Sequence, residues 1–109
     1  MFLAMYTIAE TEVFKHSADL IWRKRDRLDF IAWLAANPLA GDVIQGSGGL
    51  RKIRWSREGI GEQGGTRVIY YNLLGRGCIW LLIAYTKSKF DDLPAPFLKQ
   101  LKAGVIHGR

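Results

Sequence analysis

The chain of 109 residues contains one cysteine, two histidines and three prolines. The single cysteine, Cys78, excludes a disulfide within the chain and any zinc site built from several cysteines. The histidines, His16 and His107, have no spacing typical of a metal site or of the paired histidines with which many ribonucleases move protons. We therefore predict no metal site and no cofactor. An enzyme of this sequence would take its chemistry from Arg, Lys and Tyr.

Long hydrophobic runs are also absent. The longest, Cys78 to Ala84, is far shorter than the ~20 residues that a membrane-spanning helix requires. The first residues, MFLAMYTIAETE, have no basic segment and soon become acidic, unlike a secretory signal. These absences predict a cytoplasmic protein that does not bind a membrane.

The composition is that of a folded domain, because 49% of the residues are hydrophobic and 24% are charged. Residues 1–109 can bury a core, and no linker or repeat divides them, so we expect a single domain.

The net charge of +6 is unevenly distributed along the chain. Residues 1–50 hold five Lys/Arg and six Asp/Glu, a net charge of −1, whereas residues 51–109 hold eleven and four, a net charge of +7. An asymmetry of this kind suggests one surface that faces a polyanion.

Two glycine clusters lie in the stretch Gly41–Tyr71, and each precedes a segment in which apolar residues alternate with basic or polar ones. The segments are Leu50–Trp55 and Thr66–Tyr71. Alternation with period two, bounded by glycine, is typical of strands joined by a loop. We interpret the pair as part of a sheet that presents arginine and lysine to RNA.

Other segments predict the remaining elements. A helix over Arg25–Ala36 is indicated by apolar residues at helical spacing, and Asn37-Pro38 ends it. Its apolar face consists of Leu28, Ile31, Ala32 and Ala35, and Phe30, Trp33 and Leu34 widen that face. Shorter patterns predict a strand at Met5–Ala9, a helical region at Glu12–Trp22, an apolar strand at Cys78–Thr86 and a terminal helix at Phe97–Ala103. Alternation would place Ile79, Leu81, Ile83 and Tyr85 on one face of the apolar strand.

The connection Leu74-Gly75-Arg76-Gly77 allows a geometric test of the hairpin around it. A loop of three residues, Gly75 to Gly77 with Gly77 left-handed, would place Arg67 directly across from Tyr85. Lys87 would then lie one pleat further along the same face. A loop of two residues would move Arg67 to the opposite face from Tyr85.

Arginine, lysine and tyrosine suffice for one reaction, RNA cleavage by the adjacent 2′-hydroxyl. A guanidinium can stabilise the charge that builds on the phosphate oxygens, since it offers two parallel donors. A lysine among other cations loses its proton more readily and could accept that of the 2′-hydroxyl. A tyrosine can stack on a base or donate to the phosphate. Each of these residues could instead serve only to cover apolar surface or fill the core.

The runs GDVIQGSGGLRKIRW, GGTRVIYY and LLIAYTKSKFDDL resemble the RelE/ParE superfamily of toxins from type II toxin–antitoxin systems, and within it the RelE-like HigB toxins. The resemblance covers Asn37 to Leu93. It implies a compact α/β (α+β) fold in which an N-terminal strand and helices pack on an antiparallel β-sheet with a short C-terminal helix. It also implies an mRNA endoribonuclease that acts at the ribosomal A site, and a helix-turn-helix antitoxin as partner.

The resemblance further implies roles for individual residues. Arg67 of GGTR would clamp the transition state, Tyr85 of AYTK would stack on a base or orient the phosphate, and Lys87 would transfer a proton or bind phosphate. Further RNA contacts would come from Arg51, Lys52, Arg54 and Arg57. Ser88 stands where relatives carry an arginine after the lysine, and Phe97 stands where many carry a tyrosine. The resemblance therefore does not identify the residues that act as general acid and general base.

Two other functions are compatible with the sequence. Superfamily members related to ParE poison gyrase, a protein target, and do not cleave RNA. The chain could also be a nucleic-acid-binding module without activity. The basic and aromatic set GGTR/AYTK favours the nuclease, because a protein inhibitor would not need it.

Overall fold

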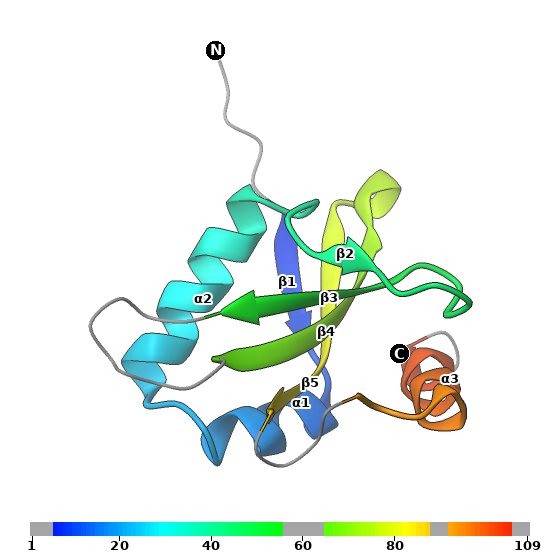
Figure 1. Ribbon diagram of the computed structural model, residues 1–109. Coiled ribbons are helices and arrows are strands. Elements are labelled where there is room, and N and C mark those ends of the chain that lie inside the picture. The colour runs from blue at the N-terminus through cyan, green and yellow to red at the C-terminus, as the bar shows by residue number, and fades with distance from the viewer. Residues whose placement is uncertain (1–5, 56–64, 88–91, 106–109) are drawn as a thin grey trace.

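The computed structural model describes residues 6–55, 65–87 and 92–105. Within these residues, five strands form one sheet with the order β1-β5-β4-β3-β2 (Figure 1). The strands are β1 (Thr7–Glu10), β2 (Asp42–Val43), β3 (Leu50–Trp55), β4 (Thr66–Leu73) and β5 (Cys78–Thr86). Neighbouring strands are antiparallel except β1 and β5, which run parallel.

Helices cover both faces of the sheet (Figure 1). One face packs against α1 (Glu12–Asp19) and α2 (Lys24–Ala36) through a core that includes Phe14, Phe30 and Leu34. The other face packs against α3 (Ala95–Ala103) through a second core that includes Leu98. The predicted α+β fold, with an antiparallel sheet and a short C-terminal helix, is confirmed.

Most predicted elements occur with small shifts of their ends. Both β3 and β5 have the predicted bounds, and β4 extends two residues beyond the predicted Tyr71. The first strand begins at Thr7, α1 ends at Asp19 rather than Trp22, and α3 begins at Ala95. Strand β2 was not predicted, because two residues are too few to carry a periodic signal.

The buried face of α2 agrees with the predicted one in part. Ala35 is buried as predicted, as are Phe30 and Leu34 from the wider part of that face, whereas Leu28 is 53% exposed and Ala32 is also exposed. The helix carries apolar residues on several sides, so helical spacing alone did not give the exact centre of the buried face.

The β4–β5 hairpin pairs Arg67 with Tyr85 as predicted, but by a different route. Leu73 pairs with Cys78, so the turn has four residues rather than three. The first three residues of the turn form the short 3-10 helix η1 (Leu74–Arg76). Gly77, the fourth, adopts the predicted left-handed conformation, with φ 71°. The predicted loop length is therefore wrong. A bulge at Leu82 restores the pairing, because Tyr70 pairs with Leu81 and Ile69 with Ile83.

The bulge also corrects the predicted face of β5. Ile79 and Leu81 belong to the core beneath α1 and α2, whereas Ile83 and Tyr85 belong to the core beneath α3. One extra residue shifts the alternation, so the second half of the strand turns its side chains to the other face.

Helix α1 supplies hydrogen bonds to the bulge. The Thr11 hydroxyl donates to the carbonyls of Leu81 (3.0 Å) and Leu82 (3.2 Å) and accepts from the Phe14 amide as the N-cap of α1. The Ala84 amide donates to the Ser17 hydroxyl (3.0 Å). Strand β1 pairs with β5 only as far as Leu81, so α1 supplies hydrogen-bond partners for backbone groups of β5 around the bulge.

A second set of hydrogen bonds fixes the chain before β2. The Gly41 amide donates to the buried Tyr70 hydroxyl (2.8 Å), which donates to the Pro38 carbonyl (2.9 Å). The Arg51 guanidinium donates to the carbonyls of Gly41 (2.6 Å) and Leu39 (3.3 Å). A Cβ atom at Gly41 would lie 2.8 Å from the Tyr70 ring, so only glycine fits there without displacement.

Candidate nucleic-acid interface

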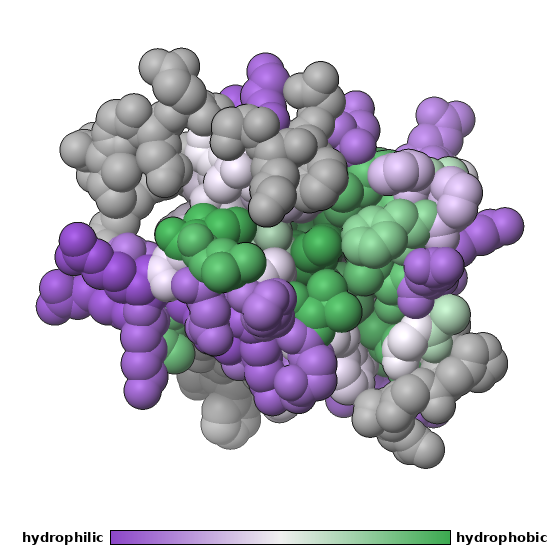
Figure 2. Space-filling view, turned by 90° about the horizontal axis from the view of Figure 1, so that it is seen from below, coloured by the Kyte–Doolittle hydropathy of each residue, from purple (hydrophilic) through white to green (hydrophobic). Residues whose placement is uncertain are grey.

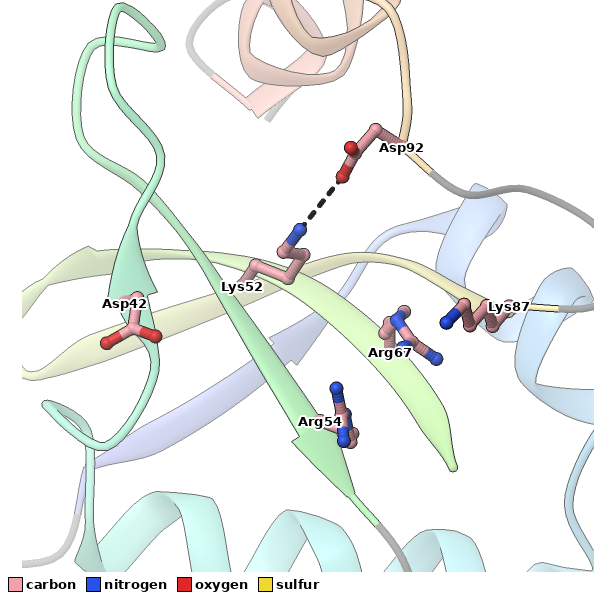
Figure 3. Close-up of a pocket in the computed structure, with 6 residues that line it drawn as sticks. All are labelled: Asp42, Lys52, Arg54, Arg67, Lys87 and Asp92. Carbon is pink, nitrogen blue, oxygen red and sulfur yellow. Dashed lines mark hydrogen bonds and ion pairs between the residues drawn. The ribbon is translucent and has the colours of Figure 1, made fainter. Parts of the chain in front are cut away.

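A basic cleft of about 670 Å³ opens on the face of the sheet that α3 covers in part (Figure 3). Its six lining residues are four cations and two carboxylates: Lys52, Arg54, Arg67, Lys87, Asp42 and Asp92. The structure therefore brings together four of the seven residues predicted from the sequence.

Arg54 and Arg67 lie directly opposite each other on β3 and β4. Their side chains leave the same face of the sheet, because directly paired residues of neighbouring strands point the same way. Two like charges in this position destabilise a sheet. An anion bound between the two guanidinium groups would remove this repulsion.

Arg67 is buried, with 7% of its surface exposed. One of its guanidinium nitrogens donates to the Gly65 carbonyl at 3.3 Å. Burying a charged side chain is costly unless it is paired and hydrogen-bonded. The sheet thus holds the Arg67 side chain in place at the floor of the cleft.

Lys52 is paired with Asp92 in the cleft, with 3.0 Å between the Lys52 Nζ and the Asp92 carboxylate (Figure 3). Asp92 precedes α3, so this ion pair joins β3 to the segment that leads into the helix. Lys87 is exposed and lies just beyond the end of β5, on the same side of the cleft as Arg67 (Figure 3).

Tyr85 is 3% exposed and packs in the core beneath α3. Its ring lines a smaller cavity of about 120 Å³ that shares Lys52 and Asp92 with the basic cleft. Burial raises the pKa of the Tyr85 hydroxyl, which Lys52 and Arg67 lower to a lesser degree. The neutral phenol is therefore favoured, and a neutral phenol can donate a proton or a hydrogen bond.

Arg51 is not part of the cleft. It projects from β3 on the face opposite to Lys52 and Arg54, and its guanidinium donates to the carbonyls of Leu39 and Gly41. The remaining predicted residue, Arg57, lies outside the described residues.

Asp42 and Asp92 were not predicted as site residues. Asp42 reaches the cleft because β2 pairs with β3, which sets Asp42 opposite Lys52. Asp92, just before α3, reaches it through its ion pair with Lys52 of β3 (Figure 3). Both positions depend on tertiary pairing, and neither residue belongs to a periodic segment from which it could have been predicted.

An apolar groove of about 260 Å³ lies beside the cleft face, where α1 begins next to α3. It is lined by Val13, Leu82, Phe97 and Leu101, among others. Figure 2, seen from below, shows apolar surface gathered on this side of the molecule. The two concave surfaces therefore differ in chemistry, one being basic and the other apolar.

No helix in the described part of the chain is long and apolar enough to cross a membrane. Among residues 6–55, 65–87 and 92–105, no three His, Cys, Asp or Glu side chains gather closely enough to hold a metal ion.

No protein-family model matches the chain. Among solved structures, it is similar to a double arginine-to-alanine mutant of the Escherichia coli toxin RelE in the free state. The TM-score is 0.58 at 13% identity, over 80% of this chain and 88% of RelE. The RelBE2 toxin–antitoxin complex from Mycobacterium tuberculosis matches at a TM-score of 0.49 and 18% identity, over 75% of this chain and 98% of that chain. The predicted resemblance to RelE is thus confirmed at the level of the fold: the chain has the fold of the RelE toxin.

Proposed function

We propose that the chain is the toxin of a type II toxin–antitoxin system and that it cleaves mRNA on the ribosome. The RelE fold supports the proposal, and one observation carries it. Arg54 and Arg67 face each other in a cleft that also holds Lys52 and Lys87. Like charges directly opposite each other lower the stability of a sheet, and a phosphodiester has the charge and the oxygens to bind both guanidinium groups.

The proposed reaction is attack of the 2′-hydroxyl on the adjacent phosphorus. It forms a 2′,3′-cyclic phosphate and releases the 5′-oxygen of the next nucleotide, which takes up a proton. Arg67 would bind the non-bridging oxygens, where negative charge grows, and would stabilise the transition state more than the ground state. Tyr85, neutral beside the cleft, would donate a hydrogen bond or a proton. Lys87 would bind the phosphate or take part in proton transfer.

Burial of Tyr85 bears on its predicted roles. A ring that is 3% exposed offers no open face to a stacked base, so orienting the phosphate fits this structure better than stacking. Because the sequence has no pair of histidines at the spacing of the usual ribonuclease pair, we expect slow cleavage of free RNA and faster cleavage when the ribosome positions the message. Equal cleavage of naked and ribosome-bound message would contradict this expectation.

The proposed partners are the ribosome, its mRNA and a cognate helix-turn-helix antitoxin. A HigB-type toxin is the subclass that the sequence motifs favour, and the cytoplasm is the compartment that this function requires.

The test is primer extension on a message in a cell-free translation system, comparing the wild type with Arg67→Ala. We expect new 5′ ends within the translated region for the wild type and none for the variant. Arg76→Ala is the matched control, because Arg76 is exposed in the turn at the far end of the β4–β5 hairpin. This variant should cleave the message as the wild type does.

Other outcomes would point to other functions. A halt in translation with the message intact would indicate an inhibitor that binds without cleaving. If neither translation nor message changed, a protein target such as gyrase, or a nucleic-acid-binding module without activity, would replace the nuclease.

A further inference from the structure

Asp42 is a carboxylate in a cleft that otherwise suits an anion. Of the two carboxylates that line the cleft, Asp92 is paired with Lys52. The Asp42 side chain is exposed and forms no hydrogen bond or ion pair with any other residue that the structure describes. Its carboxylate is thus available to a ligand, and it would repel a phosphate placed beside it.

The backbone before Asp42 is held firmly, although the side chain is exposed. The preceding residue, Gly41, donates its amide proton to the buried Tyr70 hydroxyl and accepts from Arg51 through its carbonyl. Asp42 itself pairs with Lys52 across β2 and β3. A side chain mounted on a backbone that buried groups fix in place is suited to recognition, because little order is lost when a ligand binds.

The strand register gives the distance from Asp42 to the phosphate-binding arginines. Asp42 pairs with Lys52, Lys52 lies two residues from Arg54, and Arg54 pairs with Arg67. Strands lie about 4.8 Å apart and rise about 3.3 Å per residue, so the Cα atoms of Asp42 and Arg67 are about 12 Å apart. This span is comparable with the reach from a phosphate to the Watson–Crick edge of a neighbouring base.

We propose that Asp42 binds the base next to the phosphate held by Arg54 and Arg67, and that it favours guanine. The proposal rests on the proposed function, in that the cleft must bind RNA. A carboxylate only accepts hydrogen bonds, and guanine offers two adjacent donors, N1–H and the N2 amino group. Adenine and cytosine each set one amino group beside an acceptor nitrogen, and uracil sets its single N–H between two carbonyls. Single-stranded RNA exposes these edges.

Binding of short oligouridylates tests the proposal without requiring cleavage. The oligonucleotides carry a fluorescent label and one central guanosine, adenosine, cytidine or uridine, and fluorescence anisotropy gives their affinities for the purified protein. We expect the wild type to bind the guanosine oligonucleotide about fivefold more tightly than the uridine one. This factor is at the low end of the discrimination that a bidentate contact provides, because Asp42 is exposed to solvent. Asp42→Asn should abolish that preference.

Asp92→Asn is the matched control, because it removes one carboxylate from the same cleft. It should raise the affinity for all four oligonucleotides alike and keep the preference for guanosine. Asp42→Ala provides a second variant, which also lacks an amide that could bind other bases, and it too should show no preference. Thermal unfolding of each variant would establish that it is folded.

Three results would overturn the proposal. Equal binding of the four oligonucleotides by wild type would refute the base preference and leave the proposed function standing. A guanosine preference that persists in Asp42→Asn and Asp42→Ala would assign recognition to another residue. If no oligonucleotide bound at all, the cleft would not be an RNA site, and the proposed function would fail together with this one.

Discussion

The guanidinium of Arg67 is buried beside a second arginine, and this arrangement lowers the stability of the sheet. Arg54 is directly opposite and exposed to solvent. A structural role for either residue would favour an oppositely charged or apolar partner at the paired position. A bound phosphate would offset the repulsion between the two side chains, which fits the proposed function.

The first prediction separates stability from binding at this pair. Arg54→Gln removes one of the two like charges and keeps a long polar side chain. We expect the free energy of unfolding to rise by about 0.2–1 kcal/mol, measured by urea denaturation, and RNA affinity to fall. Arg76→Gln, far from the cleft in the turn, should change neither. A loss of stability in Arg54→Gln would mean that Arg54 serves the fold.

The second prediction concerns Tyr85 and pH. Burial raises the pKa of its hydroxyl above the ordinary value of 10.0, so the folded state holds the phenolic proton more tightly than the unfolded chain does. The stability that this provides is complete below pH 10 and is lost as pH rises through the raised pKa. Tyr85→Phe should therefore lose less stability than wild type between pH 9 and pH 11, as followed by urea denaturation.

Tyr70 is also buried, with a raised pKa, and its contribution remains in the Tyr85→Phe variant. Some alkaline loss of stability should persist for that reason. Identical alkaline profiles for wild type and Tyr85→Phe would show that Tyr85 ionises as freely in the folded state as in the unfolded one.

At the scale of elements, the bulge in β5 and its attachment to α1 determine where the cleft residues lie. Pairing begins at the turn in a register that, if continued, would place Ala84 across from Arg67. The extra residue changes the register and brings Tyr85 opposite Arg67 instead. The hydrogen bonds from Thr11 and Ser17 are formed at this point.

The third prediction tests that attachment. Thr11→Val keeps the shape of the side chain but removes a helix cap and two hydrogen bonds to the bulge. We expect a loss of about 1–3 kcal/mol in the free energy of unfolding, and reduced cleavage per folded molecule because Tyr85 and Lys87 shift. Thr7→Val, at an exposed position in β1, is the control and should be close to neutral. Full activity in folded Thr11→Val would contradict the link between bulge and cleft.

Sequence periodicity predicted the strands that carry the cleft and missed what their tertiary pairing adds. Alternation in Leu50–Trp55 and Thr66–Tyr71 identified both strands, and the structure places Lys52, Arg54 and Arg67 of these strands in one cleft. The four-residue turn and the bulge at Leu82 were not predicted, because neither has a signal in the periodicity of the sequence.

The two remaining differences have different causes. Alternation along β3 already sends Arg51 to the face opposite to Lys52 and Arg54, where the carbonyls of Leu39 and Gly41 accept from it, so its assignment to the RNA surface was an error in reading the pattern. Asp42 enters the cleft only through pairing with β3, which depends on a chain segment fixed by Tyr70, and no local pattern contains that pairing.

At the scale of the whole molecule, the described cations differ in how they are neutralised on the two faces of the sheet. The four cations of the cleft lie together, whereas on the opposite face the Lys24 and Arg25 of α2 stand beside Asp26 and Asp29, and Arg27 forms ion pairs with Glu10 and Asp19. Among the described residues, we therefore expect the cleft to contribute most to the salt dependence of polyanion binding.

The fourth prediction measures this dependence. For single-stranded RNA, each phosphate contact contributes roughly 0.7 to the slope of log affinity against log salt concentration. Lys87→Ala should reduce the slope by roughly 0.7. Lys24→Ala, which removes the same charge from the exposed start of α2, should leave it unchanged. Equal effects of the two substitutions would mean that RNA responds to net charge rather than to the cleft.

The bulge also indicates where this protein can become shorter. Deletion of Leu82 would leave Leu81 paired with Tyr70 and Ile83 paired with Ile69, in an unbroken ladder that still sets Tyr85 across from Arg67. Deletion of Trp80 would instead move every residue between it and the turn to the wrong face. A scan of single deletions through Cys78–Thr86 should therefore yield soluble, folded protein at the bulge and insoluble protein near the turn. Leu82, the extra residue of the bulge, is thus the residue of β5 whose deletion we expect the fold to tolerate.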